Sequence, residues 1–184
     1  MPILGVIDSA KSGNLSVPSY NSIATFNGDG TTTNYTFSSI PQTYKHLQLR
    51  VYGTSQAAVG GDDPEWRFNG VLSGYAYAIA WEAGGNSQSF QSTYNTGTMF
   101  LSYDGFQGAN AGTTNTGSIV VDITDYTNTN RYKTVISQGG RMVPGGGGRV
   151  YQAIGLITQL PAITSIYFGM RLRTGGYAAL YGIK

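Results

Sequence analysis

Short stretches in which apolar and polar residues alternate run along most of the chain, and clusters of turn-forming residues separate them. Such alternation is typical of β-strands, because neighbouring side chains of a strand point to opposite faces of a sheet. No stretch places its apolar residues at the 3.6-residue spacing of a helix, so we expect little helix. The alternation predicts strands at residues 22–26, 34–37, 44–53, 65–70, 75–81, 97–103, 117–126, 131–140, 150–158, 163–173 and 178–183.

The same alternation predicts which side chains face the core. One dry and one wet face on each strand is expected when two antiparallel sheets pack face to face. We therefore predict an all-β fold, an antiparallel two-sheet sandwich that is jelly-roll-like, since its strands outnumber the roughly seven to nine of an immunoglobulin sandwich. A single closed sheet is the competing architecture. The predicted buried rows are Leu47, Leu49 and Val51; Ile119, Val121 and Ile123; and Ile166, Phe168, Met170 and Leu172.

The first twenty residues do not fit this pattern. Gly5, Gly13 and Pro18 interrupt any regular element, yet the segment is rich in aliphatic residues. We expect residues 1–20 to form an extended N-terminal anchoring arm and residues 21–184 to form one β-sandwich domain. The arm would fill pockets on a neighbouring protein or add to an exposed sheet edge, and the alternative is that it docks on its own sandwich. Its predicted partner-binding residues are Ile3, Leu4, Val6, Ile7, Leu15 and Val17.

Composition narrows the range of partners. Charged residues make up 11% of the chain, against roughly 25% in an average soluble protein, and the net charge is only +2. The basic residues are scattered rather than clustered, so we expect no nucleic-acid partner. No run of about 18 apolar residues predicts a membrane span, and the first residues lack the basic and apolar regions of a signal peptide. We expect a protein that is made and folded in the cytoplasm, without an export signal of its own.

Candidate chemistry is sparse. The single histidine, His46, lies on the polar face of a predicted strand without a nucleophile motif nearby, which favours an ordinary surface or interface role. The cluster GGDDPE could supply Asp62 and Asp63 as calcium ligands, but the EF-hand pattern is absent and Asp-Pro is a common turn former. The chain has no cysteine, so a zinc site lacks ligands. We expect no catalytic residue, metal or cofactor, and a protein that binds rather than catalyses.

The aromatic residues divide into two groups. Trp66, Phe68 and Trp81 are expected to fill the core of the sandwich. Tyrosines suit interfaces because they combine apolar area with a hydroxyl group. Four of them have strand neighbours that suggest the outer face, so we predict Tyr126, Tyr132, Tyr151 and Tyr167 as further partner-binding residues.

Five short motifs along the chain carry a resemblance to a known family. They are the ILG of Ile3–Gly5, the SIAT of Ser22–Thr25, the block SIPQTYKHLQLR of Ser39–Arg50, the RFNG of Arg67–Gly70 and the LYGIK of Leu180–Lys184. Together they resemble a family of small virion structural proteins of tailed bacteriophages. The SIPxTYKHLQxR block is the most specific of them.

The resemblance implies a virion protein made in the host cytoplasm. The family is associated both with capsid decoration and with minor tail or fibre components. We expect a non-enzymatic capsid decoration, or cement, protein that binds the phage major capsid protein or another virion protein and forms a homo-oligomer, a trimer or a dimer. The alternative is a tail or head fibre component that binds host-surface glycans.

Overall fold

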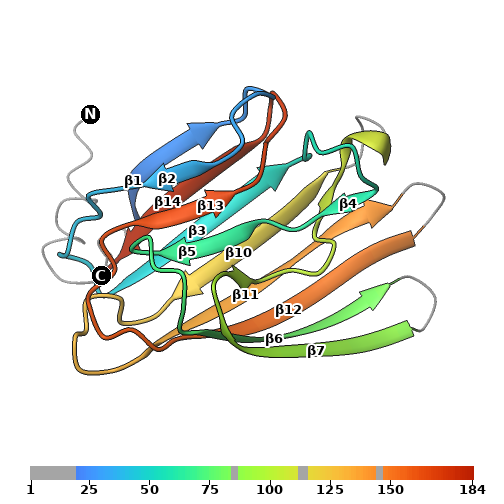
Figure 1. The fold of residues 1–184 in the computed structure, drawn as a ribbon. Helices are drawn as coiled ribbons and strands as arrows, with labels where there is room; N and C mark the ends of the chain where they lie inside the picture. Colours follow the sequence, from blue (N-terminus) through green and yellow to red (C-terminus); the bar gives the residue numbers. More distant parts are fainter. Residues whose placement is uncertain (1–19, 84–86, 112–115, 144–146) are drawn as a thin grey trace, which may run out of the picture.

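The protein is an antiparallel β-sandwich in the computed structural model, which describes residues 20–83, 87–111, 116–143 and 147–184 (Figure 1). The predicted all-β, two-sheet fold is confirmed. The expected arm and its six aliphatic residues lie outside the described residues, apart from Tyr20. No helix within the described ranges is long and apolar enough to cross a membrane.

The larger sheet has eight strands. In spatial order they are β1 (Tyr20–Asn27), β14 (Tyr177–Ile183), β3 (His46–Gly53), β10 (Gly117–Ile123), β11 (Lys133–Val143), β12 (Gly147–Ile157), β6 (Tyr75–Ala83) and β7 (Ser87–Thr96).

The smaller sheet has four strands, β2 (Tyr35–Phe37), β13 (Ile166–Gly169), β5 (Glu65–Phe68) and β8 (Met99–Phe100), in that order. A short pair, β4 (Gly61–Asp62) with β9 (Phe106–Gln107), and one 3₁₀ turn, η1 (Ala109–Ala111), complete the described elements.

The core lies between the two sheets. The predicted rows on β3, β10 and β13 are buried, and Met170 and Leu172 continue the last row beyond its strand. Trp66 is fully buried, with its ring centroid 4.9 Å from that of Phe168. Trp81 is only partly buried and stacks on Tyr103 at 3.9 Å. Burial of these large apolar groups is the main favourable contribution to folding.

Two hairpins extend the larger sheet beyond the smaller one. The chain alternates between the sheets through β1, β2, β3 and β5, but β6 and β7 both join the larger sheet, as do β10, β11 and β12. Strands β11, β12, β6 and β7 therefore widen the larger sheet (Figure 1), and the smaller sheet still reaches β6, where the Phe100 ring of β8 lies 6.1 Å from that of Tyr77. The inner faces of β12 and β6 are buried in the core, so their outer faces are the ones available for further contacts.

Residues with left-handed backbone conformations end several strands earlier than the alternation predicts. Ser39, at φ 53°, lies two residues past β2, which ends at Phe37 as the alternation predicts. Asn69 at φ 55° follows β5, and Asp125 at φ 51° lies just past β10. Asn and Asp tolerate this conformation better than most residues, which makes them natural strand ends.

Strand β7 was not predicted from the sequence. Its residues, SQSFQSTYNT, contain two aromatic side chains and no aliphatic ones, so they lack the alternation that marks a half-buried strand. Pairing with β6 from Ala83↔Ser87 to Tyr75↔Thr96 makes the segment a strand. Tertiary pairing thus overrides a weak local pattern.

Candidate functional site

The outer face of the larger sheet has two chemically different halves. On β1, β14 and β3, the Arg50 guanidinium lies over the rings of Tyr20 and Tyr181, at 5.3 and 5.1 Å from their centroids. Its Nε donates to Gln48 Oε1 at 2.7 Å, and Gln48 Nε2 donates to Asp122 Oδ1 at 2.7 Å. This half is a polar network that satisfies its own hydrogen bonds.

The other half, over β11, β12 and β6, is aliphatic. Ile136 lies beside Ile154, and Ile154 lies beside Ala78 on β6. In the next rows Leu156 pairs with Ala76, and Val150 with Glu82. We call these aliphatic residues the aliphatic band: Ile136, Val150, Ile154, Leu156, Ala76, Ala78 and Ala80.

The band is exposed although its members are apolar. Ile154 is 55% exposed and Val150 is 66% exposed, and both lie on strands whose other face is buried in the core. Single exposed apolar residues are ordinary, but Ile154 has Ile136 and Ala78 as direct neighbours and forms a patch with them. Gln152 separates this patch from Val150. Continuous exposed apolar patches mark sites where a protein meets another molecule.

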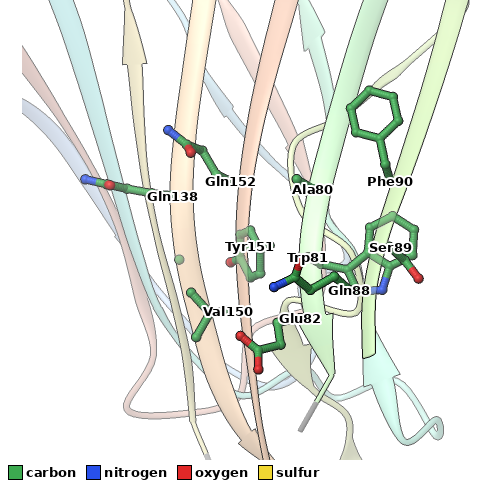
Figure 2. A pocket seen from close by; sticks show the side chains of 11 residues that line it. Ala80, Trp81, Glu82, Gln88, Ser89, Phe90, Gln138, Val150, Tyr151 and Gln152 are labelled. Carbon is green, nitrogen blue, oxygen red and sulfur yellow. The ribbon is translucent and has the colours of Figure 1, made fainter. Parts of the chain in front are cut away.

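An open hollow of about 760 Å³ crosses one end of the band (Figure 2). Ala80 forms the floor in the middle of the hollow, because its side chain is only a methyl group and is shorter than those around it. Figure 2 shows Gln138 and Gln152 on one side of Ala80 and Phe90 on the other. Glu82 and Gln88 also line it. The residues that line the hollow therefore offer hydrogen-bond donors and acceptors of side-chain amides next to apolar surface. This combination suits contact with another molecule that has both polar and apolar groups.

Tyr151 is among the residues that line this hollow, but its side chain is buried on the inner face of β12. It is 2% exposed, and its hydroxyl donates to the Ser118 carbonyl at 3.1 Å. Burial raises the pKa of this hydroxyl far above its ordinary value. Gly139 makes room for the ring, since a Cβ at that position would collide with the tyrosine hydroxyl.

Two of the four predicted interface tyrosines are not on the surface. Tyr126 and Tyr151 are both buried in the core, which corrects their expected placement on the outer face. Tyr126 lies past the end of β10, where its hydroxyl donates to the Pro41 carbonyl. Tyr151 faces the core because it alternates with the exposed Val150 and Gln152 along β12. Neither side chain is available to a partner in this structure.

The other two predicted tyrosines are accessible but lie apart from the band. Tyr132 is 57% exposed and precedes β11. Tyr167 is half-buried on β13 of the smaller sheet, where the Arg67 guanidinium lies 4.9 Å from its ring centroid. Their role as partner-binding residues stays a prediction.

The acidic residues considered for calcium form a structural network. Asp63 accepts hydrogen bonds from Ser102 Oγ at 2.8 Å and from the backbone N–H groups of Asp104 and Gly105 at 2.8 and 3.0 Å. Burial raises the pKa of its carboxyl group above the ordinary value, against these hydrogen bonds. Among the residues that the structure describes, no three His, Cys, Asp or Glu side chains gather closely enough to suggest a metal site.

Asp104 joins this network to the larger sheet. Its Oδ2 lies 2.6 Å from Arg141 Nη2 and 3.0 Å from Arg149 Nε. Arg141 also donates to Gln107 Oε1 and to the Asp104 carbonyl. The arginine thereby pins the segment between β8 and β9 against β11.

His46 and Lys133 each hold a loop. The Asp125 backbone N–H donates to His46 Nδ1 at 3.0 Å, which closes the turn after β10. Lys133 is 1% exposed, and its ammonium group donates to the carbonyls of Gln159, Leu160 and Pro161. The alternation of apolar and polar residues does not predict a buried lysine at this position.

Comparison with known proteins adds no relative, because no family model, curated protein or solved structure matches the chain.

Proposed function

We propose that this protein is a non-enzymatic structural component of a tailed-phage virion, a capsid decoration protein that docks on coat subunits. The observation that carries the proposal is the aliphatic band, which leaves Val150 and Ile154 exposed on an otherwise well-packed sheet. In this account the band meets the coat protein, and the N-terminal arm, through Ile3, Leu4, Val6, Ile7, Leu15 and Val17, holds a neighbouring subunit.

The chemistry of the band suits a lasting protein contact. Seven aliphatic side chains bury apolar surface without the desolvation cost of burying unpaired charges. Gln138 and Gln152 beside them can form hydrogen bonds to a partner's backbone. The resemblance of Ser39–Arg50 to virion structural proteins suggests that the partner is another virion protein. We propose the capsid surface as the location of the protein.

The strand order supports a jelly-roll assignment of the sandwich. Strands β1, β14, β3 and β10 lie side by side in one sheet, and β2, β13, β5 and β8 lie side by side in the other. Along the chain these eight strands alternate between the sheets, except that β5 and β8 follow each other within the smaller sheet, and this order fits the two Greek keys of a jelly roll. The hairpins β6–β7 and β11–β12 are then insertions, and they carry most of the candidate docking surface.

The test measures binding to coat-protein shells that lack this protein. We expect Ile154→Glu to lower occupancy on the shells at least about tenfold, because a carboxylate would be buried against apolar surface. Ser118→Glu places the same charge on an exposed position of β10, outside the band, and serves as the matched control. Full occupancy of the Ile154→Glu protein would refute docking through the band.

A second candidate function is that of a fibre component that binds host-surface glycans. Phe90, Gln88, Gln138 and Gln152 line the open hollow, and aromatic and amide side chains are suited to sugar rings and hydroxyl groups. A polysaccharide array tests it directly. The fibre role would be favoured over decoration if the protein binds a glycan, if Gln152→Ala abolishes that binding, and if each particle holds only a few copies of the protein.

A further inference from the structure

The larger sheet ends on an edge strand that lacks the usual protection against pairing. In the described part of the chain, β7 pairs only with β6, and its other side is free (Figure 1). The strand spans ten residues and contains no charged residue and no proline. Natural edge strands are normally short, bulged, charged or covered, because free backbone groups attract another strand.

The other sheet edges among the described strands are protected. β2 has three residues and β8 has two, which is too short to template a partner strand. β1 is longer, but a bulge between Ser22 and Ala24 limits its regular pairing after the bulge to Ala24–Asn27, whereas that of β7 runs from Ser87 to Thr93. Among the described strands, β7 thus offers the longest regular stretch of free edge.

The regular part of β7 has a definite centre. Its pairing with β6 runs without interruption from Ser87 to Thr93 and shifts only beyond Thr93. Phe90 is the middle residue of this segment. It lies on the outer face, opposite Ala80, and is 68% exposed.

These features fit a second copy of the same strand. Directly opposed residues of antiparallel strands face the same side of a sheet, so pairing centred on Phe90 keeps both outer faces together. The two Phe90 rings would then cover each other, as cross-strand aromatic pairs do. Because β7 carries no charge, the two copies meet without like-charge repulsion.

We propose that two copies of this chain pair antiparallel through β7, about a two-fold axis at Phe90. The two larger sheets then join into one continuous sheet, and the aliphatic bands of both copies share one face. An isologous contact of this kind closes on itself and produces a dimer rather than a filament. The pairing does not depend on the virion role.

Sedimentation equilibrium of the full-length protein tests the pairing. We expect the wild type to have twice the chain mass of 19.6 kDa at micromolar concentrations. Phe90→Lys places two ammonium groups opposite each other, so we expect its dimer dissociation constant to rise at least about tenfold. Val150→Lys is the matched control, because Val150 is 66% exposed on the same face but lies on β12, away from the edge.

A monomeric wild type, or a dimer that Phe90→Lys weakens no more than Val150→Lys does, would overturn the proposal. Cross-linking tests the register independently, because the chain has no cysteine. Opposed Cα atoms in an antiparallel pair lie about 4.5–5.5 Å apart, within reach of a disulfide. We expect Phe90→Cys to form a disulfide-linked dimer on mild oxidation and Ser92→Cys to stay unlinked. The opposite pattern would rule out an axis at Phe90.

Discussion

Arg141→Met is expected to destabilise the fold far more than Arg67→Met, although both remove an arginine that pairs with a carboxylate at similar distance. Arg141 Nη2 lies 2.6 Å from Asp104 Oδ2, and Arg67 Nη2 lies 2.8 Å from Glu65 Oε2. The two pairs differ in burial. The Arg141 side chain is 3% exposed, whereas those of Arg67 and Glu65 are 29% and 40% exposed.

The magnitude follows from the groups that Arg141→Met leaves behind. Gln107, which is 1% exposed, loses the guanidinium donor to its Oε1, and the Asp104 carbonyl loses its Nε donor. Breaking a buried pair costs about 3–5 kcal/mol, but Asp104 keeps Arg149 and is 25% exposed, so we expect about 3 kcal/mol. For Arg67→Met we expect about 0.5–1 kcal/mol, from an exposed ion pair and a cation–π contact with Tyr167.

Urea denaturation followed by tryptophan fluorescence measures both effects. With a slope of about 2 kcal/mol/M, Arg141→Met should lower the midpoint by about 1.5 M and Arg67→Met by less than about 0.5 M. Equal midpoint shifts for the two variants would refute the reasoning that burial, rather than distance, sets the strength of these pairs.

Three further predictions concern the buried lysine, the two titrating aspartates and the N-terminal segment. Lys133→Met removes the donor shared by three carbonyls, so we expect the unfolding free energy to fall by about 2 kcal/mol; an unchanged urea midpoint would contradict that role. Hydrogen bonds from the Thr32 hydroxyl and the Thr32 and Thr31 backbone hold the Asp29 pKa far below 3.8, so its contribution to stability is present above pH 3.8 and is lost on further acidification. Burial raises the Asp63 pKa above 3.8, so stability falls as the pH rises from 3.8 through that pKa. In unfolding free energies measured against pH, Asp29→Ala should flatten the acid limb and Asp63→Asn the fall above pH 3.8; unchanged limbs would contradict these assignments. Deleting residues 1–17 should leave the thermal unfolding midpoint unchanged and abolish binding to coat-protein shells; full occupancy by the shortened chain would contradict the anchoring role.

The sandwich was predictable because, in most of its strands, the alternation of apolar and polar residues shows which face is buried. The alternation along β3, β10 and β13 assigned Leu49, Val121 and Phe168 to the core, and all three are buried. One face of each strand meets the other sheet, so periodicity alone is enough to separate the faces. Strand ends were less predictable, since they depend on single left-handed residues such as Asn69 and Asp125.

The candidate docking surface was not predictable in the same way. Aliphatic residues on the outer face, such as Ile136 and Ile154, look like core residues in the sequence, because β11 and β12 carry aliphatic residues on both faces. For the same reason Tyr151 was expected outside when it lies inside. The sequence of β7 shows no strand pattern at all, since its mostly polar residues form a strand only through pairing with β6. These errors concern the hairpins β6–β7 and β11–β12, where only the spatial arrangement decides which face is covered.

The account depends most on the claim that the aliphatic band is where this protein meets its partner. Imaging of a decorated phage particle at subunit resolution tests that claim directly. We expect the outer face of β11, β12 and β6 to lie against coat subunits, with Ile154 and Val150 buried in the contact. A particle in which this face points into solvent, or one that carries no copy of the protein on its capsid, would contradict the account.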